Sequence, residues 1–135
     1  MADLEPSPRD VHPVVTGNAQ DSDHAGWFVG HFMAAASGLQ TSDVEVKWSS
    51  YVGGEHRDGW GANRTATTLC VLVRGRFHLR FPDREVWLER EGEFCQWAPG
   101  VPHYWQADGE TVVISVRWPS LEGDSMSVGP PAGSA

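Results

Sequence analysis

The chain of 135 residues has only two cysteines and one lysine. Cys70 and Cys95 lie inside short apolar runs rather than in a spaced framework, so neither a disulfide scaffold nor a thiolate zinc site is expected. Free cysteine is among the most buried residue types. We therefore expect two buried, reduced thiols.

Long apolar runs and clusters of basic residues are also missing. No segment approaches the roughly 18 apolar residues that cross a membrane, and the N-terminus has no basic segment followed by an apolar one. The formal net charge is -8, whereas a protein that binds phosphates needs clustered lysine and arginine. The sequence predicts a cytoplasmic protein that has no membrane or nucleic-acid partner.

Helical periodicity is absent, while 15 glycines and nine prolines indicate many turns. Residues 1–25 and 119–135 have little apolar surface and several prolines, so we expect flexible segments at both ends. Residues 26–118 are long enough for one domain with one core. His12 and His24 fall in the N-terminal segment and are not expected to have a functional role.

Short runs of alternating character fill residues 26–118. In residues 44–49 the even-numbered positions are apolar and the odd-numbered ones polar, and in residues 76–81 the odd-numbered positions are apolar. Each pattern predicts a strand that has one buried and one solvated face. Further strands are expected over residues 26–32, 67–74, 84–90 and 111–118, and a helical turn over 33–37. About eight antiparallel strands of this kind must close or pack as two sheets.

The segment from Gly92 to His103 resembles the second conserved motif of the cupins, which is Gly, five residues, Pro, one residue, Gly, two residues, His, three residues, Asn. Gly92, Gly100 and His103 stand at the family spacing, while Ala98 replaces the proline and Ala107 the asparagine. A glycine turn of this kind lets the histidine begin a strand with its ring inside the barrel. The resemblance implies an all-β fold, the antiparallel double-stranded β-helix or jelly-roll barrel, with little helix.

The rest of the chain resembles small, single-domain cupins of a poorly characterised group, but its first cupin motif is degraded. Gly75 closes that motif, and Thr68 stands where the family has a liganding glutamate. The two usual spacings place the family's paired histidines at Ala62 and Arg64, or at Gly61 and Asn63. The resemblance therefore preserves at most one of the four usual ligands, His103.

A cupin metal site implies one divalent ion, Fe, Mn or Zn, and such a site needs at least three protein ligands. His103 is the first candidate, and it is also the candidate catalytic residue. His56 would join it only through a shifted loop register, and His31 would join it if the strand face that it shares with Trp27 lines the cavity. The alternatives are a His103 that caps a turn at the mouth of the barrel, and a His31 at a subunit contact or bonded to a backbone carbonyl.

Aromatic and arginine side chains are the candidate substrate-binding groups. Trp48, Trp97 and Trp105 could form an apolar wall, and Trp105 should share a face with His103 because it lies two residues further along a strand. Arg57 and Arg117 could hold a carboxylate or phosphate as planar forks, although arginines at such places are more often on the surface.

Three functions remain open from the sequence. The first is an enzyme that transforms a small, largely apolar metabolite in the barrel with His103 at the site, and isomerases, cyclases and oxygenases are among the activities that the resemblance implies. The second is a non-catalytic ligand-binding or sensing cupin that has lost the metal ligands. The third is a filled barrel that acts through a homodimer, whose edge strand would pair across subunits.

Overall fold

The computed structural model describes residues 13–132. The sequence-based expectations for residues 1–12, which include His12, and for residues 133–135 lie outside this range. Within it, no helix is long and apolar enough to span a bilayer.

The regular secondary structure of the described chain is almost entirely short antiparallel strands, which confirms the predicted all-β class. Its helical elements are two single 3-10 turns, and the second lies within residues 33–37, where a helical turn was expected. The elements in chain order are η1 (Ala19–Asp21), β1 (Trp27–Val29), η2 (Ala35–Ser37), β2 (Glu45–Tyr51), β3 (Trp60–Asn63), β4 (Thr67–Arg74), β5 (Phe77–Phe81), β6 (Arg84–Leu88), β7 (Phe94–Trp97), β8 (Tyr104–Ala107), β9 (Thr111–Trp118) and β10 (Ser125–Val128).

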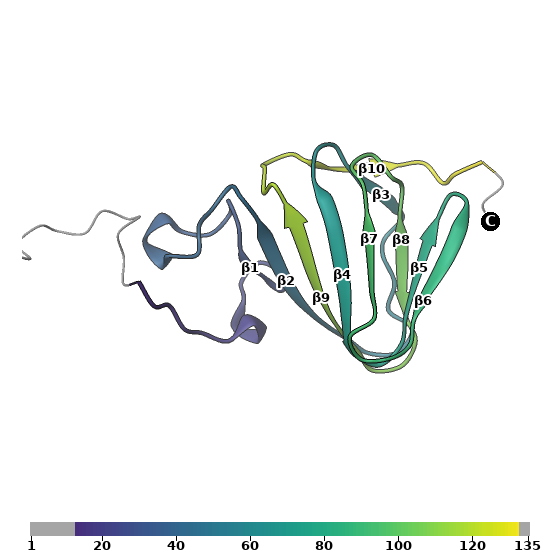
Figure 1. The fold of residues 1–135 in the computed structure, drawn as a ribbon, viewed down its shortest axis with the longest axis horizontal. Coiled ribbons are helices and arrows are strands. Elements are labelled where there is room, and N and C mark those ends of the chain that lie inside the picture. The colour runs from purple at the N-terminus through teal and green to yellow at the C-terminus, as the bar shows by residue number, and fades with distance from the viewer. Residues whose placement is uncertain (1–12, 133–135) are drawn as a thin grey trace, which may run out of the picture.

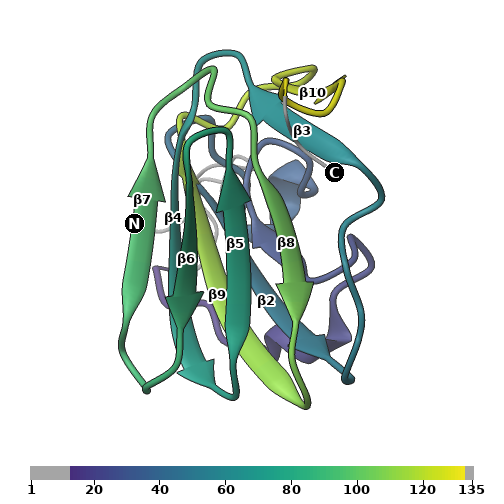
Figure 2. The ribbon, with the colours of Figure 1, turned by 90° about the vertical axis from the view of Figure 1, so that its right-hand side faces the viewer.

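The strands form three sheets around one interior. One sheet has the order β1-β2-β9-β4-β7, a second has the order β6-β5-β8, and β10 pairs with β3 alone. Figure 1 shows the two larger sheets converging at the bottom of the view and diverging toward the top, where β3 and β10 lie. Figure 2 shows the three-stranded sheet in front of the larger one, with β3 and β10 again at the upper end. This is the expected barrel of facing sheets.

One end of the interior is apolar. Leu72 of β4 and Val113 of β9 face Phe77 and Leu79 of β5, and all four are at most 2% exposed. The turn before β5 requires glycine, because Gly75 has a φ of 93° and a Cβ there would lie 2.7 Å from the Cα of Thr111. Phe77 and Leu79 are buried as the alternation over residues 76–81 predicted, but the expected solvated face holds only in part, because His78 stacks on Trp87 and is 7% exposed.

The other end of the interior is more polar, because two rows of inward positions in the large sheet combine charged and hydroxyl side chains with Trp97, Cys70 and Cys95 of the apolar cluster. In the first row Glu45 pairs with Arg117, Arg117 with Thr68, and Thr68 with Trp97. In the second row, two residues further along each strand, the aligned residues are Lys47, Ser115, Cys70 and Cys95. Residues aligned in this way share one face of a sheet.

Strand β2 presents the face opposite to the one predicted. Glu45 and Ser49 are buried and Lys47 is half-buried on the inward face, whereas Val46 and Trp48 lie on the outer face. The prediction was wrong because it assumed that polar side chains face solvent, and this barrel has a polar interior at the end where β2 begins. The apolar residues instead extend an outer apolar row in which Val46 pairs with Val116 of β9.

Regular structure continues past residue 118, the predicted end of the domain. Strand β10 pairs with β3, and the carboxylate of Asp124 accepts hydrogen bonds from the backbone N–H groups of Thr65 and Ala66 at 2.8 and 3.1 Å. These bonds lower the pKa of Asp124, against the effect of its burial. Residues 119–128 therefore belong to the folded unit.

Candidate functional site

His103 lies inside the barrel at its polar end. Gly61 and His103 exchange backbone hydrogen bonds of 2.8 and 3.1 Å, so the two residues lie directly opposite each other and share the inward face. The side chain packs against the indole of Trp97 with ring centroids 4.9 Å apart, and the residue is 4% exposed. His103 is therefore buried on the inward face, and its role as a site residue stays a prediction.

Burial keeps the imidazole of His103 neutral at neutral pH. It lowers the pKa of His103 from 6.5 to about 4, and the charges of Arg57 and Arg117 act in the same direction. The Nδ1 atom lies 3.2 Å from the carbonyl oxygen of Val101. When Nδ1 carries the proton and donates to that carbonyl, Nε2 is left as a hydrogen-bond acceptor.

The side chain of Arg57 fills the space beside Gly61. A Cβ on Gly61 would overlap the Nη2 and Cζ atoms of Arg57 and lie 2.9 Å from its Nε. The backbone N–H of Arg57 donates to the carbonyl of Trp105 at 2.9 Å, which fixes this loop along β8. The absence of a side chain at Gly61 therefore lets a guanidinium lie next to the position of His103.

Arg117 extends from β9 into the same end of the barrel. Its Nη1 is 3.4 Å from Oε2 of Glu45, and its Cζ lies 4.7 Å from the centroid of the Trp27 ring. Arg117 shares the inward face with Ser115 and Val113, as predicted. Both predicted arginines thus lie near His103, close enough for their charges to lower its pKa.

Two further inward side chains were not predicted as site residues. Lys47 lies 5.7 Å from the Trp27 ring centroid, and burial together with the charge of Arg117 lowers its pKa. The Sγ of Cys70 lies 3.4 Å from the hydroxyl oxygen of Ser115, and burial raises the pKa of this thiol to about 11. Lys47 was missed because the alternation in β2 was assigned to the wrong face.

Several buried polar atoms on the inward face have no hydrogen-bond partner within the described residues. They are Nε of Arg57, Nε of Arg117, Oγ of Ser49, Oγ1 of Thr68 and Nε1 of Trp97. Thr68 and Trp97 are 2% and 8% exposed. Buried donors are usually paired, so these unpaired atoms are polar groups that a bound polar molecule would satisfy.

The inward positions do not provide a cupin metal site. Gly61 has no side chain, and the Nδ2 of Asn63 donates to the carboxylate of Asp124 at 3.3 Å. Thr68, at the position of the family's glutamate, offers only a hydroxyl. No group of three His, Cys, Asp or Glu side chains in residues 13–132 could hold a metal ion. The residues present therefore do not fit a divalent ion.

The structure does not bring His56 together with His103. The Nδ1 of His56 lies 2.9 Å from the hydroxyl of Tyr104, and the two rings stack. Tyr104 lies in the chain between His103 and Trp105, whose side chains point inward, so its own side chain points to the outer face. His56 is exposed there, and the loop shift that the predicted ligand set required does not occur.

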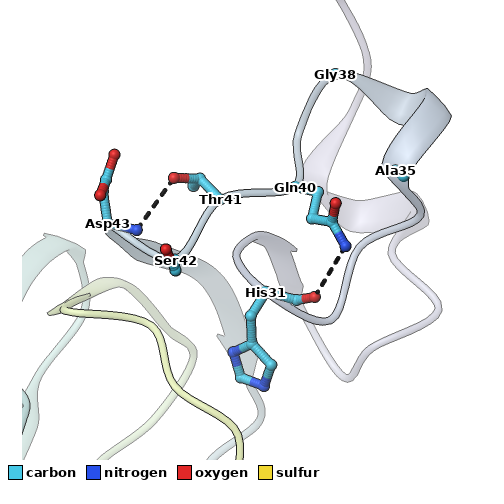
Figure 3. Close-up of a pocket in the computed structure, with 7 residues that line it drawn as sticks. All are labelled: His31, Ala35, Gly38, Gln40, Thr41, Ser42 and Asp43. Atoms are coloured by element: carbon cyan, nitrogen blue, oxygen red, sulfur yellow. Dashed lines mark hydrogen bonds between the residues drawn. The ribbon is translucent and has the colours of Figure 1, made fainter. Parts of the chain in front are cut away.

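His31 lines a separate surface pocket of about 550 Å³, which Figure 3 shows. Its Nδ1 lies 2.7 Å from the hydroxyl oxygen of Ser120, and that hydroxyl donates to Oε1 of Glu45 at 2.8 Å. Because the Ser120 hydroxyl uses its hydrogen in the bond to Glu45, it can only accept from His31, so the Nδ1 of His31 carries a proton and donates to Ser120. His31 therefore lines a different pocket from the inward face that holds His103, and a chain of hydrogen bonds through Ser120 and Glu45 links it to Arg117.

Two of the three predicted tryptophans face the interior. Trp97 contacts His103, and Trp105 lies beside Tyr51 and Phe77 with ring centroids 4.4 and 5.6 Å away. Trp105 shares a face with His103 as predicted, but it lies toward the apolar end. Trp48 is on the outer face, where its Nε1 donates to Ser50 at 3.3 Å, so the interpretation of Trp48 as a substrate-binding residue was wrong.

Solved structures match this architecture, although no protein-family model and no curated protein matches the chain. A conserved protein with a double-stranded β-helix domain from Klebsiella pneumoniae is 15% identical, with a TM-score of 0.58, over 67% of this chain and 78% of that protein. A cupin protein from Bacteroides fragilis is 16% identical, with a TM-score of 0.54, over 67% and 79%. The DMSP lyase DddQ from Ruegeria pomeroyi is 13% identical, with a TM-score of 0.59, over 73% of this chain and 49% of the lyase.

Sequence identities this low show that the proteins share a fold, and they do not show a shared activity. The strand order, the facing sheets and these neighbours agree with the motif from Gly92 to His103. The chain therefore has the cupin fold, a double-stranded β-helix.

Proposed function

We propose that the polar end of the barrel binds a small organic molecule and that His103 meets this molecule as a neutral hydrogen-bonding group. The observation that carries the proposal is the set of buried polar atoms at Arg57, Arg117, Thr68 and Trp97 that have no hydrogen-bond partner within the described residues. Leaving a buried donor unpaired costs about 1–3 kcal/mol, and a ligand that accepts from these groups removes that cost. The aromatic faces of Trp97 and Trp105 would hold the apolar part of the ligand.

The lowered pKa of His103 supports binding more strongly than acid–base catalysis. A group whose pKa is about 4 is almost fully deprotonated at pH 7, so it cannot donate a proton in the free protein, and it is a weak base. The second candidate function is an enzyme in which the bound ligand raises the pKa of His103 and so makes proton transfer effective. A DMSP lyase shares the fold, so the fold itself is compatible with catalysis.

A library of small acids, alcohols, amides and aromatic compounds, screened by NMR, tests the proposal. We expect some members to shift both the Trp97 indole N–H and the His103 imidazole signals. His103→Ala should weaken their binding, while His56→Ala, which changes an exposed histidine on the outer face, should not. Binding that shifts only outer-face signals, or that His103→Ala leaves unchanged, would sink the proposal.

Treatment with a chelator tests whether a metal is involved. Because Gly61, Asn63 and Thr68 do not provide ligands, we expect dialysis against EDTA to leave binding unchanged. Elemental analysis should find far less than one metal ion per chain. Loss of binding on chelation, restored by Fe, Mn or Zn, would show that the assignment of these positions is wrong.

Self-association and the cytoplasmic location stay predictions. The outer face of the large sheet offers a surface for a homodimer, because half-buried Val46, Trp48, Ile114 and Val116 share that face with Phe94, which is 66% exposed. Exposed apolar patches often mark interaction surfaces. Sedimentation equilibrium would test the dimer.

A further inference from the structure

Three cationic side chains gather at the polar end of the barrel. Arg57, Arg117 and Lys47 extend from the loop before β3, from β9 and from β2, and the charge of Arg117 lowers the pKa of each of the other two after the larger effect of their burial. Within residues 13–132, only Arg117 among them has a carboxylate partner, Glu45 at 3.4 Å. The polar end therefore has an excess of positive charge in a protein whose net charge is -8.

The guanidinium groups are arranged with their inner donors available. An arginine binds an oxyanion most strongly when Nε and one Nη donate side by side. The Nε atoms of Arg57 and Arg117 are both buried and have no partner in the described part of the chain. Glu45 does not satisfy this edge of Arg117, because the short contact is to Nη1.

Neutral donors complete the surroundings of the two arginines. Thr68 pairs with Arg117 across the strands, and Trp97 pairs with Thr68, so an acceptor placed over this row meets a hydroxyl and an indole N–H beside a guanidinium. Both atoms are unpaired among the described residues. Several donors and one sign of charge favour a ligand that is rich in acceptors and negatively charged.

On the basis of the function proposed above, we infer that the barrel recognises the oxyanion group of its ligand, a carboxylate or a phosphate, through Arg57 and Arg117. The guanidinium of Arg57, which lies over Gly61, then supplies the positive charge that a metal ion supplies at this place in metal-binding cupins. A divalent cation in the same space would be repelled by three cationic side chains, whereas an anion relieves their mutual repulsion.

Three probes that share one ring separate the charge of the ligand from its shape. Benzoate carries a carboxylate, phenyl phosphate carries a phosphate, and benzamide is a neutral analogue of benzoate. We expect benzoate or phenyl phosphate to shift the Nε–H signals of Arg57 and Arg117 and the indole signal of Trp97 in NMR titrations. The tighter of the two anions identifies the head group, and benzamide should bind at least roughly tenfold more weakly, since charge-assisted bonds are about twice as strong as neutral ones.

Matched variants assign the effect to the two arginines. Arg57→Gln and Arg117→Gln should each weaken anion binding by roughly 10- to 100-fold, because each removes charge-assisted hydrogen bonds. Arg64→Gln is the control, since it removes the same charge from an exposed position. Equal losses in all three variants, or no loss with either inner arginine, would overturn the inference.

Gly61→Ala tests the position of Arg57 without changing any charge. The added Cβ overlaps the flexible end of the Arg57 side chain, and the backbone of Gly61 does not have a positive φ, so the guanidinium moves while the fold is retained. We expect weaker anion binding and unchanged thermal stability. Unchanged binding would refute a role for this guanidinium.

The outcomes distinguish this inference from the function on which it rests. If benzamide binds as tightly as benzoate and shifts the same Trp97 and His103 signals, the barrel binds small molecules but does not select anions. If neither anion shifts these signals while neutral members of the library do, the inference fails and the proposed binding site stands; if no member of the library shifts them, both fail.

Discussion

The neutral state of His103 should appear as a pH dependence of stability that a substitution removes. In the folded chain the pKa of His103 is about 4, whereas its ordinary value is 6.5. Between these values the unfolded chain binds a proton that the folded chain does not, so stability falls as the pH falls from about 6.5 to about 4. The full effect is about 3 kcal/mol, and between pH 7 and pH 5 it is about 2 kcal/mol.

Urea denaturation followed by tryptophan fluorescence measures this effect. Wild type and His103→Gln are compared at pH 7, 6 and 5, because carboxylates and the other histidines contribute equally to both proteins. The difference in the free energy of unfolding between the two should change by about 2 kcal/mol in favour of the variant as the pH falls to 5. His56→Gln, which alters an exposed histidine, should keep the wild-type dependence.

A difference between wild type and His103→Gln that is constant from pH 7 to pH 5 would refute the reasoning. It would mean that the imidazole takes up a proton as readily in the folded chain as in the unfolded one. The burial of His103 against Trp97 would then not exclude water from it, and the argument for a neutral hydrogen-bonding group would fail.

Two further predictions concern Asp124 and the thiols. Asp124→Ala leaves two backbone N–H groups without their acceptor, so it should lower the free energy of unfolding by about 2–5 kcal/mol. Glu122→Ala, at an exposed position, should change this free energy little. A loss below about 1 kcal/mol for Asp124→Ala in urea titrations would contradict the prediction. Burial raises the pKa of the Cys70 thiol to about 11. In the variant Cys95→Ser, Cys70 should therefore react with a disulfide reagent at pH 8 far more slowly in the folded protein than in urea. Equal rates in the two conditions would contradict the burial of Cys70.

The fold was predictable from the sequence because turn glycines and alternating strands are local signals. Gly75 and the motif that ends at His103 fixed the barrel register, and β4 and β9 begin and end where their runs of apolar residues do. The face of β2 was not predictable in the same way. Alternation shows that two faces differ, but whether Lys47 or Trp48 points inward depends on the polarity of the interior, which the facing strands determine.

The candidate site was predictable only in part. His103, Trp97, Trp105 and Arg117 were predicted because a motif or a shared strand face relates each of them to the barrel, whereas Arg57 was predicted only from the chemistry of its guanidinium.

The role of Gly61 and the separation of the three histidines could not be predicted. Whether Arg57 folds back over Gly61 depends on the path of a loop, and the distance from His31 to His103 depends on how a segment outside the barrel packs through Ser120. A local sequence pattern contains no information on the path of a loop or on the packing of a distant segment.

Because the guanidinium of Arg57 lies over Gly61, the positive charge of the proposed anion site is part of the chain itself. Arginine keeps its charge at every physiological pH, no chelator extracts it, and it has no second oxidation state. A barrel that carries its cation in the chain is complete as soon as it folds, in every copy. A barrel that depends on a metal ion is complete only in the fraction of copies that the cellular supply of that ion can load.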